Sequence, residues 1–388
     1  MAIRFGVDQI IAQNPSWKNQ RIGFLTNDAA RTSNHIHSRI ALLKAGFNIQ
    51  LLFSPEHGID TKGADGAKMQ NGIDPLTHLP ILSLYGEKYA PTEKDVAEID
   101  ILLFDIPDAG TRFYTYLWSM TYWMEAAVRF NKKVIILDRP NPIGANLAMA
   151  EGPRLDISTA SFIGRFDIPV KHQCTLGELA LYFNSTKQWN ASLEVIACEG
   201  LNRDDVFTHW KQDWIPTSPA IQNFNACLLY PGLCFFEATN VSVGRGTTYS
   251  FEWIGANWFN IDAIKMVCQN ILSEDLKIEI LKLPITNNPQ QLTTGIRIKV
   301  IDPYHFDAVL NGLLLLKLIR DTHPKNFKWI PYPTIANPSG ENHLSLLLGI
   351  PDAENLFELP LQQWLQQINR LLKVSGWRAL IAPYLLYH

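Results

Sequence analysis

The pair Glu56-His57 is the part of the sequence whose residue types best suit acid/base chemistry. It lies in the segment Ser54-Pro55-Glu56-His57-Gly58, directly after an apolar run that ends at Phe53. A carboxylate beside an imidazole at the edge of a pocket can donate and accept protons. The alternative is structural, with Glu56 capping the following turn and His57 bonded to the backbone.

A second candidate group is the segment 110–116, which reads GTRFYTY. Arg112 is a fixed cation suited to bidentate recognition of a carboxylate. Tyr114 and Tyr116 provide hydroxyls and flat faces for a sugar ring. The alternative is the first turn of a helix that packs its aromatic side chains into the core.

The segment 237–248, EATNVSVGRGTT, is dense in hydrogen-bonding residues and flanked by apolar stretches. Two glycines surround Arg245 and would let the backbone pass close to a ligand. Asn240 and Glu237 belong to the same segment, so it predicts a binding loop. A polar surface loop is the alternative.

Short apolar runs alternate with helical patterns through the first half of the chain, which indicates a parallel sheet covered on both faces. The predicted strands are 21–26, 48–53, 100–105, 133–138 and 193–198, and the predicted helices are 34–46, 116–130 and one starting near 175. In such sheets ligands bind outside the carboxyl ends of the strands. Asn141 follows one strand between Pro140 and Pro142, where either substrate binding or turn chemistry would explain it.

The pattern changes after a proline-rich stretch, Pro216 to Pro231, which we interpret as irregular and as a domain seam. Beyond it, apolar and charged residues alternate over 296–300, typical of a strand with one solvated face. Helices are predicted over 306–320 and behind Pro360. We therefore expect an α/β protein with two domains, 1–218 and 219–388.

Composition excludes several functions. The chain has 388 residues and a net charge of −3, so it has no basic field for nucleic acid or an anionic membrane. No apolar run reaches the ~18 residues of a membrane span. No basic and apolar leader opens the chain, which predicts a cytoplasmic protein or the mature form of a periplasmic or secreted one.

Cofactor and metal motifs are missing as well. The first strand runs into FLTNDAART without the glycines of a dinucleotide site, and no phosphate loop, zinc-protease motif or nucleophile elbow occurs. The five cysteines form no C-x-x-C pair, so disulfides and a zinc ribbon are not expected. We predict no cofactor and no metal.

Taken in order, several motifs resemble the exo-β-N-acetylmuramidase family. They are SPEHG, SLYG, FDI-x-D-x-G-x-RFYTY, LDRPNP, GELA and YPG-x-C-x-FE-x-TNVS-x-GRGTT, and they cover most of the chain, most densely over 21–258. The resemblance implies a Rossmann-like domain joined to a smaller C-terminal α/β domain, with the active site in the cleft between them. It also implies release of terminal N-acetylmuramic acid from the non-reducing ends of peptidoglycan fragments (MurNAc-GlcNAc).

Residue by residue, the resemblance assigns catalysis to Glu56, with His57 and Tyr114 beside it. It places substrate-binding residues at Arg112, Tyr116, Asn240 and Arg245, and to these we add Asn141 and Glu237 from their positions in the sequence. The sequence departs from the family pattern in the loop GIDTKGADGAKMQNG and at Ala238, where glycine is usual. The first departure is expected to alter the rim of the cleft.

Glycoside cleavage needs a proton donor for the leaving oxygen and a second group that attacks or activates water. Glu56 is the predicted donor. The second group is left open among Asp105, Glu237, His57 and Tyr114, and the acetamido group of the substrate is a further candidate. Arg112 or Arg245 is expected to bind the lactyl carboxylate.

Two other functions compete with the hydrolase. One is a non-catalytic protein that binds sugar or peptidoglycan in the same cleft. The other, a nucleotide-dependent transferase, would need a phosphate loop that the sequence lacks. The sequence leaves the oligomeric state and the stereochemical outcome open.

Overall fold

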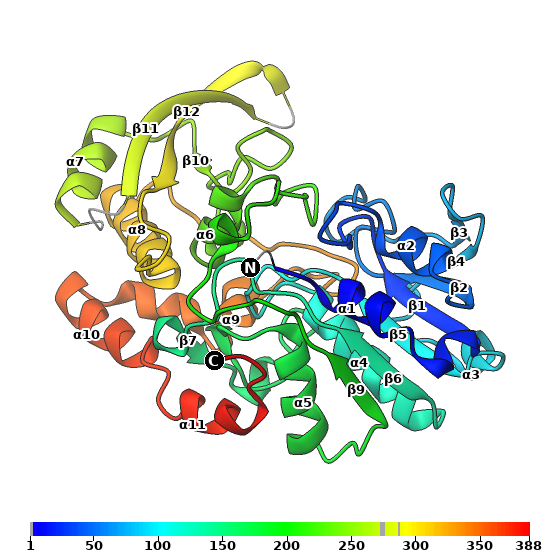
Figure 1. The fold of residues 1–388 in the computed structure, drawn as a ribbon. Helices are drawn as coiled ribbons and strands as arrows, with labels where there is room; N and C mark the ends of the chain where they lie inside the picture. The colour runs from blue at the N-terminus through cyan, green and yellow to red at the C-terminus, as the bar shows by residue number, and fades with distance from the viewer. Residues whose placement is uncertain (1–2, 272–275, 286–287) are drawn as a thin grey trace.

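A computed structural model describes residues 3–271, 276–285 and 288–388. Its largest element is a seven-stranded sheet in which all neighbours are parallel except β3 and β4 (Figure 1). In spatial order the strands are β3 (Gly72–Ile73), β4 (Pro80–Ser83), β2 (Ile49–Ser54), β1 (Ile22–Thr26), β5 (Ile101–Asp105), β6 (Lys133–Leu137) and β9 (Leu193–Ile196). The predicted parallel sheet of an α/β fold is confirmed.

Both faces of this sheet are buried. Side chains point alternately to one face and the other along each strand. In β5, Leu102 and Phe104 belong to one hydrophobic cluster, while Ile101 and Leu103 belong to another on the opposite face. The helices of this half are α1 (Gly6–Gln13), α2 (Ser38–Lys44), α3 (Glu93–Val96), α4 (Tyr116–Arg129) and α5 (Leu176–Thr186). The continuous apolar strands of the sequence therefore reflect burial on two sides.

The second half contains a small antiparallel sheet in the order β10 (Trp253–Gly255), β12 (Asn288–Val300) and β11 (Leu276–Ile285). Ile296 and Ile298 are buried, whereas Arg297 and Lys299 are half-buried and pair with acidic side chains. The predicted alternation over 296–300 is thus confirmed. The accompanying helices are α6 (Phe224–Leu233), α7 (Ile261–Ile271), α8 (Ala308–Thr322), α9 (His343–Leu348), α10 (Leu361–Leu371) and α11 (Trp377–Ile381).

Helix α6 corrects the prediction that the proline-rich stretch is irregular as far as Pro231. The helix runs from Phe224 to Leu233 and includes Pro231 in its last turn. All its residues from Ala226 onward are buried, as expected for a helix that is apolar on every side. Burial of this apolar surface outweighs the backbone hydrogen bond that proline removes.

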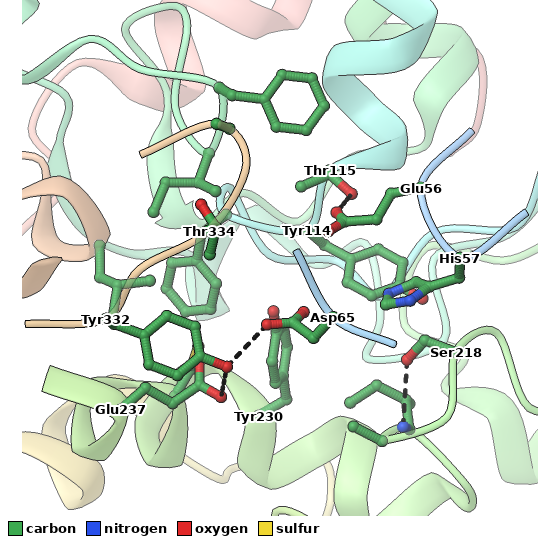
Figure 2. Close-up of a pocket in the computed structure, with 18 of the residues that line it drawn as sticks. Glu56, His57, Asp65, Tyr114, Thr115, Ser218, Tyr230, Glu237, Tyr332 and Thr334 are labelled. Atoms are coloured by element: carbon green, nitrogen blue, oxygen red, sulfur yellow. Dashed lines mark hydrogen bonds between the residues drawn. The ribbon is translucent and has the colours of Figure 1, made fainter. Parts of the chain in front are cut away.

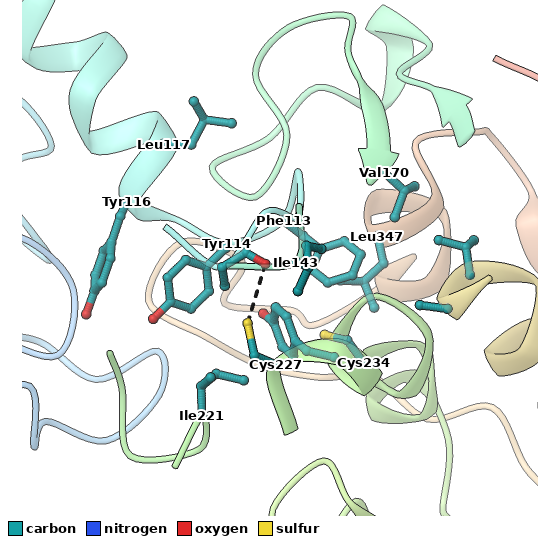
Figure 3. Packing of buried hydrophobic residues seen from close by; sticks show 14 of the residues in the cluster. Phe113, Tyr114, Tyr116, Leu117, Ile143, Val170, Ile221, Cys227, Cys234 and Leu347 are labelled. Atoms are coloured by element: carbon teal, nitrogen blue, oxygen red, sulfur yellow. Dashed lines mark hydrogen bonds between the residues drawn. The ribbon is translucent and has the colours of Figure 1, made fainter. Parts of the chain in front are cut away.

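The two halves share one continuous core. Phe113, from the loop after β5, packs edge-on against Tyr230 of α6 and Phe235 just beyond it, with ring centroids 5.3 and 5.9 Å apart. Figure 3 shows Phe113 and Tyr114 beside Cys227 and Cys234 at this junction. The loop that follows a strand of the large sheet is therefore anchored directly on the second half.

The end of the chain returns to the first half (Figure 1). Trp377 donates to the backbone oxygen of His172 over 2.9 Å, and the Tyr387 hydroxyl donates to Asp138 over 2.6 Å. A short hairpin of β7 (Glu151–Arg154) and β8 (Pro169–Lys171) lies beside it, since Gly152 bonds to the backbone of Leu372. The C-terminal residues thus pack on both parts of the fold.

Cys174, Cys227 and Cys234 are buried free thiols, and Cys198 is a half-buried one. The side chain of Cys268 lies outside the described residues. Within the described ranges, no helix combines the length and apolar character needed to cross a membrane.

Candidate active site

Glu56 lies at the carboxyl end of β2, where the strand runs into Pro55 and then turns away. Its side chain is 5% exposed, and both carboxylate oxygens are held. The Thr115 hydroxyl donates to Oε2 over 2.6 Å, and the Gly66 backbone N–H donates to Oε1 over 3.0 Å. Glu56 is therefore a positioned carboxylate at the edge where α/β sheets bind ligands.

His57 adopts a left-handed backbone conformation, with φ of 66°, which is uncommon for a residue with a side chain. Its Nδ1 lies 2.8 Å from the backbone oxygen of Gly63, so we assign the ring proton to Nδ1. That tautomer leaves the lone pair of Nε2 as an acceptor. His57 thus makes the backbone hydrogen bond of the structural alternative, while its Nε2 can still take part in the predicted acid/base chemistry.

Glu56 and His57 line a cavity whose empty space, counted together with the open solvent at its mouth, is about 610 Å³. Both halves of the chain contribute to the wall (Figure 2). Polar residues that line it are Glu56, His57, Asp65, Tyr85, Tyr114, Thr115, Ser218, Tyr230, Glu237, Arg245, Tyr332, Thr334 and His343. The predicted cleft between the two parts is thus present.

Asp65 is a second carboxylate at the cavity, and it is not among the residues predicted from the sequence. One oxygen of Asp65, one oxygen of Glu56 and one ring nitrogen of His57 lie within 4.8 Å of one another. The Tyr332 hydroxyl donates to Asp65 over 2.8 Å, and Arg245 lies 3.5 Å away. Burial raises the pKa of Asp65, but the charge of Arg245 and the Tyr332 hydroxyl outweigh it, so the net pKa lies below the usual value.

The loop that carries Asp65 is fixed by close backbone contact with the second half. Gly66 has φ of 64°, and a Cβ there would lie 2.8 Å from the Cβ of Thr334. The Ile335 N–H donates to the Gly66 backbone oxygen over 3.1 Å. Glycine at this position therefore brings Asp65 to the cavity and aims the Gly66 N–H at Glu56.

Glu237 and Arg245 form an ion pair in the wall next to Asp65. Burial raises the pKa of Glu237 above its usual range, and the charge of Arg245 opposes that shift. The Arg245 guanidinium also lies 4.9 Å from the centre of the Phe251 ring. The predicted binding loop does reach the cavity with these two residues.

His343 and Tyr332 complete this wall, stacked with ring centroids 4.7 Å apart. Burial lowers the pKa of His343 to about 4, the positive charge of Arg245 adds to this effect, and Asp65 opposes it. His343 is therefore neutral near pH 7. Its Nε2 is buried without a hydrogen-bond partner among the described residues.

Arg112 lies outside the cavity. It is fully buried and donates to three backbone oxygens, those of Pro153, Ile168 and Leu347, over 2.8–2.9 Å. Burial lowers its pKa to about 9. Its Nε has no partner among the described residues, but Nη1 and Nη2 both donate to backbone oxygens. Because Arg112 also does not line the cavity, this placement does not support the predicted contact with a substrate carboxylate.

The other predicted binding residues also bond to the protein. Tyr116 donates its hydroxyl to the Thr217 backbone over 2.7 Å, and Tyr114 donates to the Thr217 side chain over 2.6 Å. Only Tyr114 of this pair lines the cavity. Asn141 holds its own turn through the Ile143 N–H, and Asn240 pairs with the backbone of the 326–328 segment, so neither reaches the cavity.

Asp105, a candidate for the second catalytic group, is fully buried and pairs with Arg139, whose Nη2 lies 2.9 Å from Oδ2. It does not line the cavity. Asp65 is instead the carboxylate whose oxygen lies within 4.8 Å of an oxygen of Glu56. The only sequence feature that pointed to Asp65 was that its loop, GIDTKGADGAKMQNG, departs from the family pattern.

Glu56, His57 and Asp65 are close enough for each to offer a ligand atom to a metal ion. Glu56 already accepts hydrogen bonds from Thr115 and Gly66, and Asp65 from Tyr332. Such a donor set suits proton transfer and charge stabilisation as directly as it suits a cation.

The fold and this cavity define an α/β enzyme of the glycoside hydrolase class, in which paired carboxylates face a wall of aromatic and hydroxyl side chains. The chain belongs to the exo-β-N-acetylmuramidase NamZ family. The family model for the N-terminal part matches residues 22–225, and the model for the C-terminal part matches residues 228–387.

The chain is 33% identical over 374 residues to the peptidoglycan β-N-acetylmuramidase NamZ of Bacillus subtilis (strain 168), covering 93% of this chain and 89% of that protein. Two solved structures of DUF1343 family proteins from Bacteroides fragilis NCTC 9343 have similar folds. Their TM-scores are 0.86 and 0.68 at 26% and 29% identity, and each comparison covers 100% of this chain and 99% of the other.

Proposed function

We propose that this protein is an exo-acting glycoside hydrolase that releases N-acetylmuramic acid from the non-reducing ends of peptidoglycan fragments. The observation that carries the proposal is the close approach of Glu56 and Asp65, within 4.8 Å, in a cavity that both halves of the chain line. The similarity to a peptidoglycan β-N-acetylmuramidase supports the choice of sugar.

In this proposal Glu56 protonates the glycosidic oxygen as its bond to the anomeric carbon breaks. Carboxyl groups ~5–5.5 Å apart are typical of retaining glycosidases, whereas inverting ones need ~6.5–9.5 Å for a water molecule. One oxygen of Glu56 and one of Asp65 lie within 4.8 Å of each other, and this close approach is the reason that we propose retention. Glu56, now a carboxylate, would then take a proton from the water that releases the sugar.

Asp65 is the proposed second group because its lowered pKa keeps it anionic. It either attacks the anomeric carbon or orients the acetamido group of the substrate for that attack. Both routes pass through two displacements and retain the β configuration. Tyr332 and Arg245 hold the Asp65 carboxylate in place for either role.

Arg245 and His343 are the proposed binding groups for the lactyl carboxylate. Arg245 already faces Glu237 and Asp65, but the raised pKa of Glu237 favours its neutral form when another anion approaches. His343 adds a neutral donor, since its Nε2 has no partner among the described residues and its ring lines the cavity.

The test is hydrolysis of a synthetic β-N-acetylmuramide by the purified protein, with the matching β-N-acetylglucosaminide as the control. We expect release of the aglycone from the muramide and much slower release from the glucosaminide. Binding of both sugars without release would instead indicate a non-catalytic sugar-binding protein. Mid-chain cleavage of a glycan would contradict exo action.

A further inference from the structure

An aromatic strip, made of Tyr85, Tyr89, Tyr122 and Phe162, begins beside Glu56 and leads out of the cavity. Tyr85 and Phe162 line the cavity. Burial raises the pKa of the Tyr85 hydroxyl, and the charge of Glu56 and a hydrogen bond to it raise that pKa further. Tyr89 and Tyr122 do not line the cavity, and both are half-buried. The strip therefore extends the cavity wall from Glu56 towards solvent.

Tyr89 holds the strip together. Its ring centroid lies 5.8 Å from that of Tyr85 and 4.4 Å from that of Phe162. The Tyr122 ring follows, 5.9 Å from Tyr89, and the planes of Tyr89, Tyr122 and Phe162 lie within 31° of one another. The rings come from three segments, which are the loop after β4, helix α4 and the turn 161–164. Similarly oriented rings of this kind provide a surface for the apolar face of a sugar ring.

Arg165 places a cation against the strip, but its charge is already paired. The guanidinium carbon lies 3.6 Å from the centre of the Tyr122 ring. Its nitrogens donate to both oxygens of Glu125 over 2.9 and 3.0 Å and to the Thr121 hydroxyl over 2.6 Å. Arg165 thus fixes the Tyr122 ring without leaving a free charge of its own, so the strip suits a neutral ligand.

The proposed reaction defines which part of the substrate meets the strip. Glu56 protonates the glycosidic oxygen in that reaction, so the leaving sugar must lie next to Glu56. Arg245, the proposed partner of the lactyl carboxylate, pairs with Glu237, and Figure 2 shows Asp65 between Glu56 and Glu237. The lactyl group of the bound muramic acid therefore points away from Glu56. The leaving sugar lies on the Glu56 side, where the strip begins.

We propose that the aromatic strip is the binding site for the leaving sugar, a neutral N-acetylhexosamine on the reducing side of the bond that is cleaved. The apolar face of this sugar packs against Tyr89 and Tyr122, and Tyr85 joins the site to the acid. The identity of the ligand rests on the proposed hydrolysis of MurNAc-GlcNAc. The strip gives a sugar leaving group an advantage in binding over a small one.

Two ligands that resist hydrolysis separate the strip from the cavity. The S-linked disaccharide MurNAc-GlcNAc reaches the strip, whereas the methyl β-thioglycoside of MurNAc is too short to reach it. Isothermal titration calorimetry should show that wild type binds the disaccharide about tenfold more tightly. Tyr89→Ala should remove this advantage and leave the Kd of the methyl thioglycoside unchanged. Tyr89→Phe keeps the ring and should retain the advantage.

Tyr122→Ala tests the same surface if Tyr89→Ala fails to fold. Tyr304→Ala is the matched control, because Tyr304 is 37% exposed and does not line the cavity, and it should bind both ligands as wild type does. Equal affinity of wild type for the two ligands would overturn the strip, as would an advantage that survives in Tyr89→Ala and Tyr122→Ala. Either result would leave the proposed hydrolysis standing. Failure of wild type to bind either ligand would overturn the strip, and failure to hydrolyse the muramide would separately overturn the proposed function.

Discussion

Thr115 donates its hydroxyl to Glu56 across 2.6 Å, and this bond joins the end of β2 to the residue that precedes α4. Each residue follows a different parallel strand of the sheet, so the sheet itself sets their separation. The Gly66 N–H fixes the other oxygen of Glu56 from a loop that the second half of the protein holds. The proposed acid is thus positioned by three separate parts of the fold.

Asp65→Asn should reduce kcat for the muramide by ~10²–10⁴-fold, because the amide keeps the Tyr332 contact and loses the negative charge. KM should change little, since the charge acts mainly in the transition state. Steady-state kinetics on a disaccharide measure both values. Asp60→Asn is the matched control, because Asp60 belongs to the same loop but does not line the cavity, and it should behave as wild type. Equal kcat values for Asp65→Asn and wild type would remove Asp65 from the mechanism.

Arg245→Ala should lower the ratio of kcat/KM for the muramide to kcat/KM for the glucosaminide. Loss of a buried charged contact typically costs ~2–5 kcal/mol, so kcat/KM for the muramide should fall by at least ~30-fold. The glucosaminide, which lacks the lactyl carboxylate, provides the internal comparison. An unchanged ratio of the two kcat/KM values would place recognition of the carboxylate on other residues.

Arg112→Ala should act on stability and not on substrate preference. The change leaves three buried backbone oxygens without their donor, and we expect a loss of ~3 kcal/mol or more in the free energy of unfolding. Urea unfolding measures the loss, and the substrate ratio of any folded fraction should equal that of wild type. A stable variant with a reduced preference for muramide would restore Arg112 as a binding residue.

Hydrolysis should retain the β configuration. ¹H NMR of the reaction in its first minutes, before mutarotation, distinguishes the two anomers of the released sugar. The spacing of Glu56 and Asp65 predicts the β anomer first. Initial appearance of the α anomer would indicate an inverting enzyme and a different second group.

Asp138 predicts a pH dependence of stability. Burial raises its pKa to about 6, although Tyr387, Thr175 and Gly177 donate hydrogen bonds that lower it. The folded protein therefore holds this proton more tightly than the unfolded chain, whose carboxyl has a pKa near ~3.9. The resulting stabilisation is complete below the unfolded pKa and is lost as the pH rises through 6.

Between pH 4 and pH 7, wild type should lose on the order of 2 kcal/mol relative to Asp138→Asn, whose amide does not titrate. Urea unfolding of both proteins at the two pH values gives this difference. If the free energies of unfolding of wild type and Asp138→Asn change equally between the two pH values, Asp138 does not have a raised pKa in the folded state.

The parts of the site that the sequence predicted follow directly from local patterns. An apolar strand that runs into Glu56 and His57 places them at the carboxyl edge of a parallel sheet, and the glycines around Arg245 predicted a loop near a ligand. The first prediction needs only the period of the apolar residues and the rule that ligands bind at that edge, and the second needs only the local composition of the loop.

The parts that the sequence missed depend on contacts between distant segments. Asp65 belongs to a loop without apolar period and reaches the cavity only because Tyr332 and Thr334 press against that loop. Arg112 has the residue type of a carboxylate ligand, but three backbone oxygens from separate segments surround it. No local pattern distinguishes a buried arginine of this kind from one that binds substrate.

Glu56→Gln is the most direct test of the proposed mechanism. Glutamine keeps the shape of the side chain and removes the proton that the leaving oxygen needs, so kcat on an unactivated MurNAc-GlcNAc disaccharide should fall by ~10²–10⁴-fold. An aryl muramide needs little protonation to depart and should be affected less in its first step. The fold should survive, as circular dichroism and the melting temperature would show. Near-normal turnover of the disaccharide by Glu56→Gln would contradict the assignment of Glu56 as the general acid.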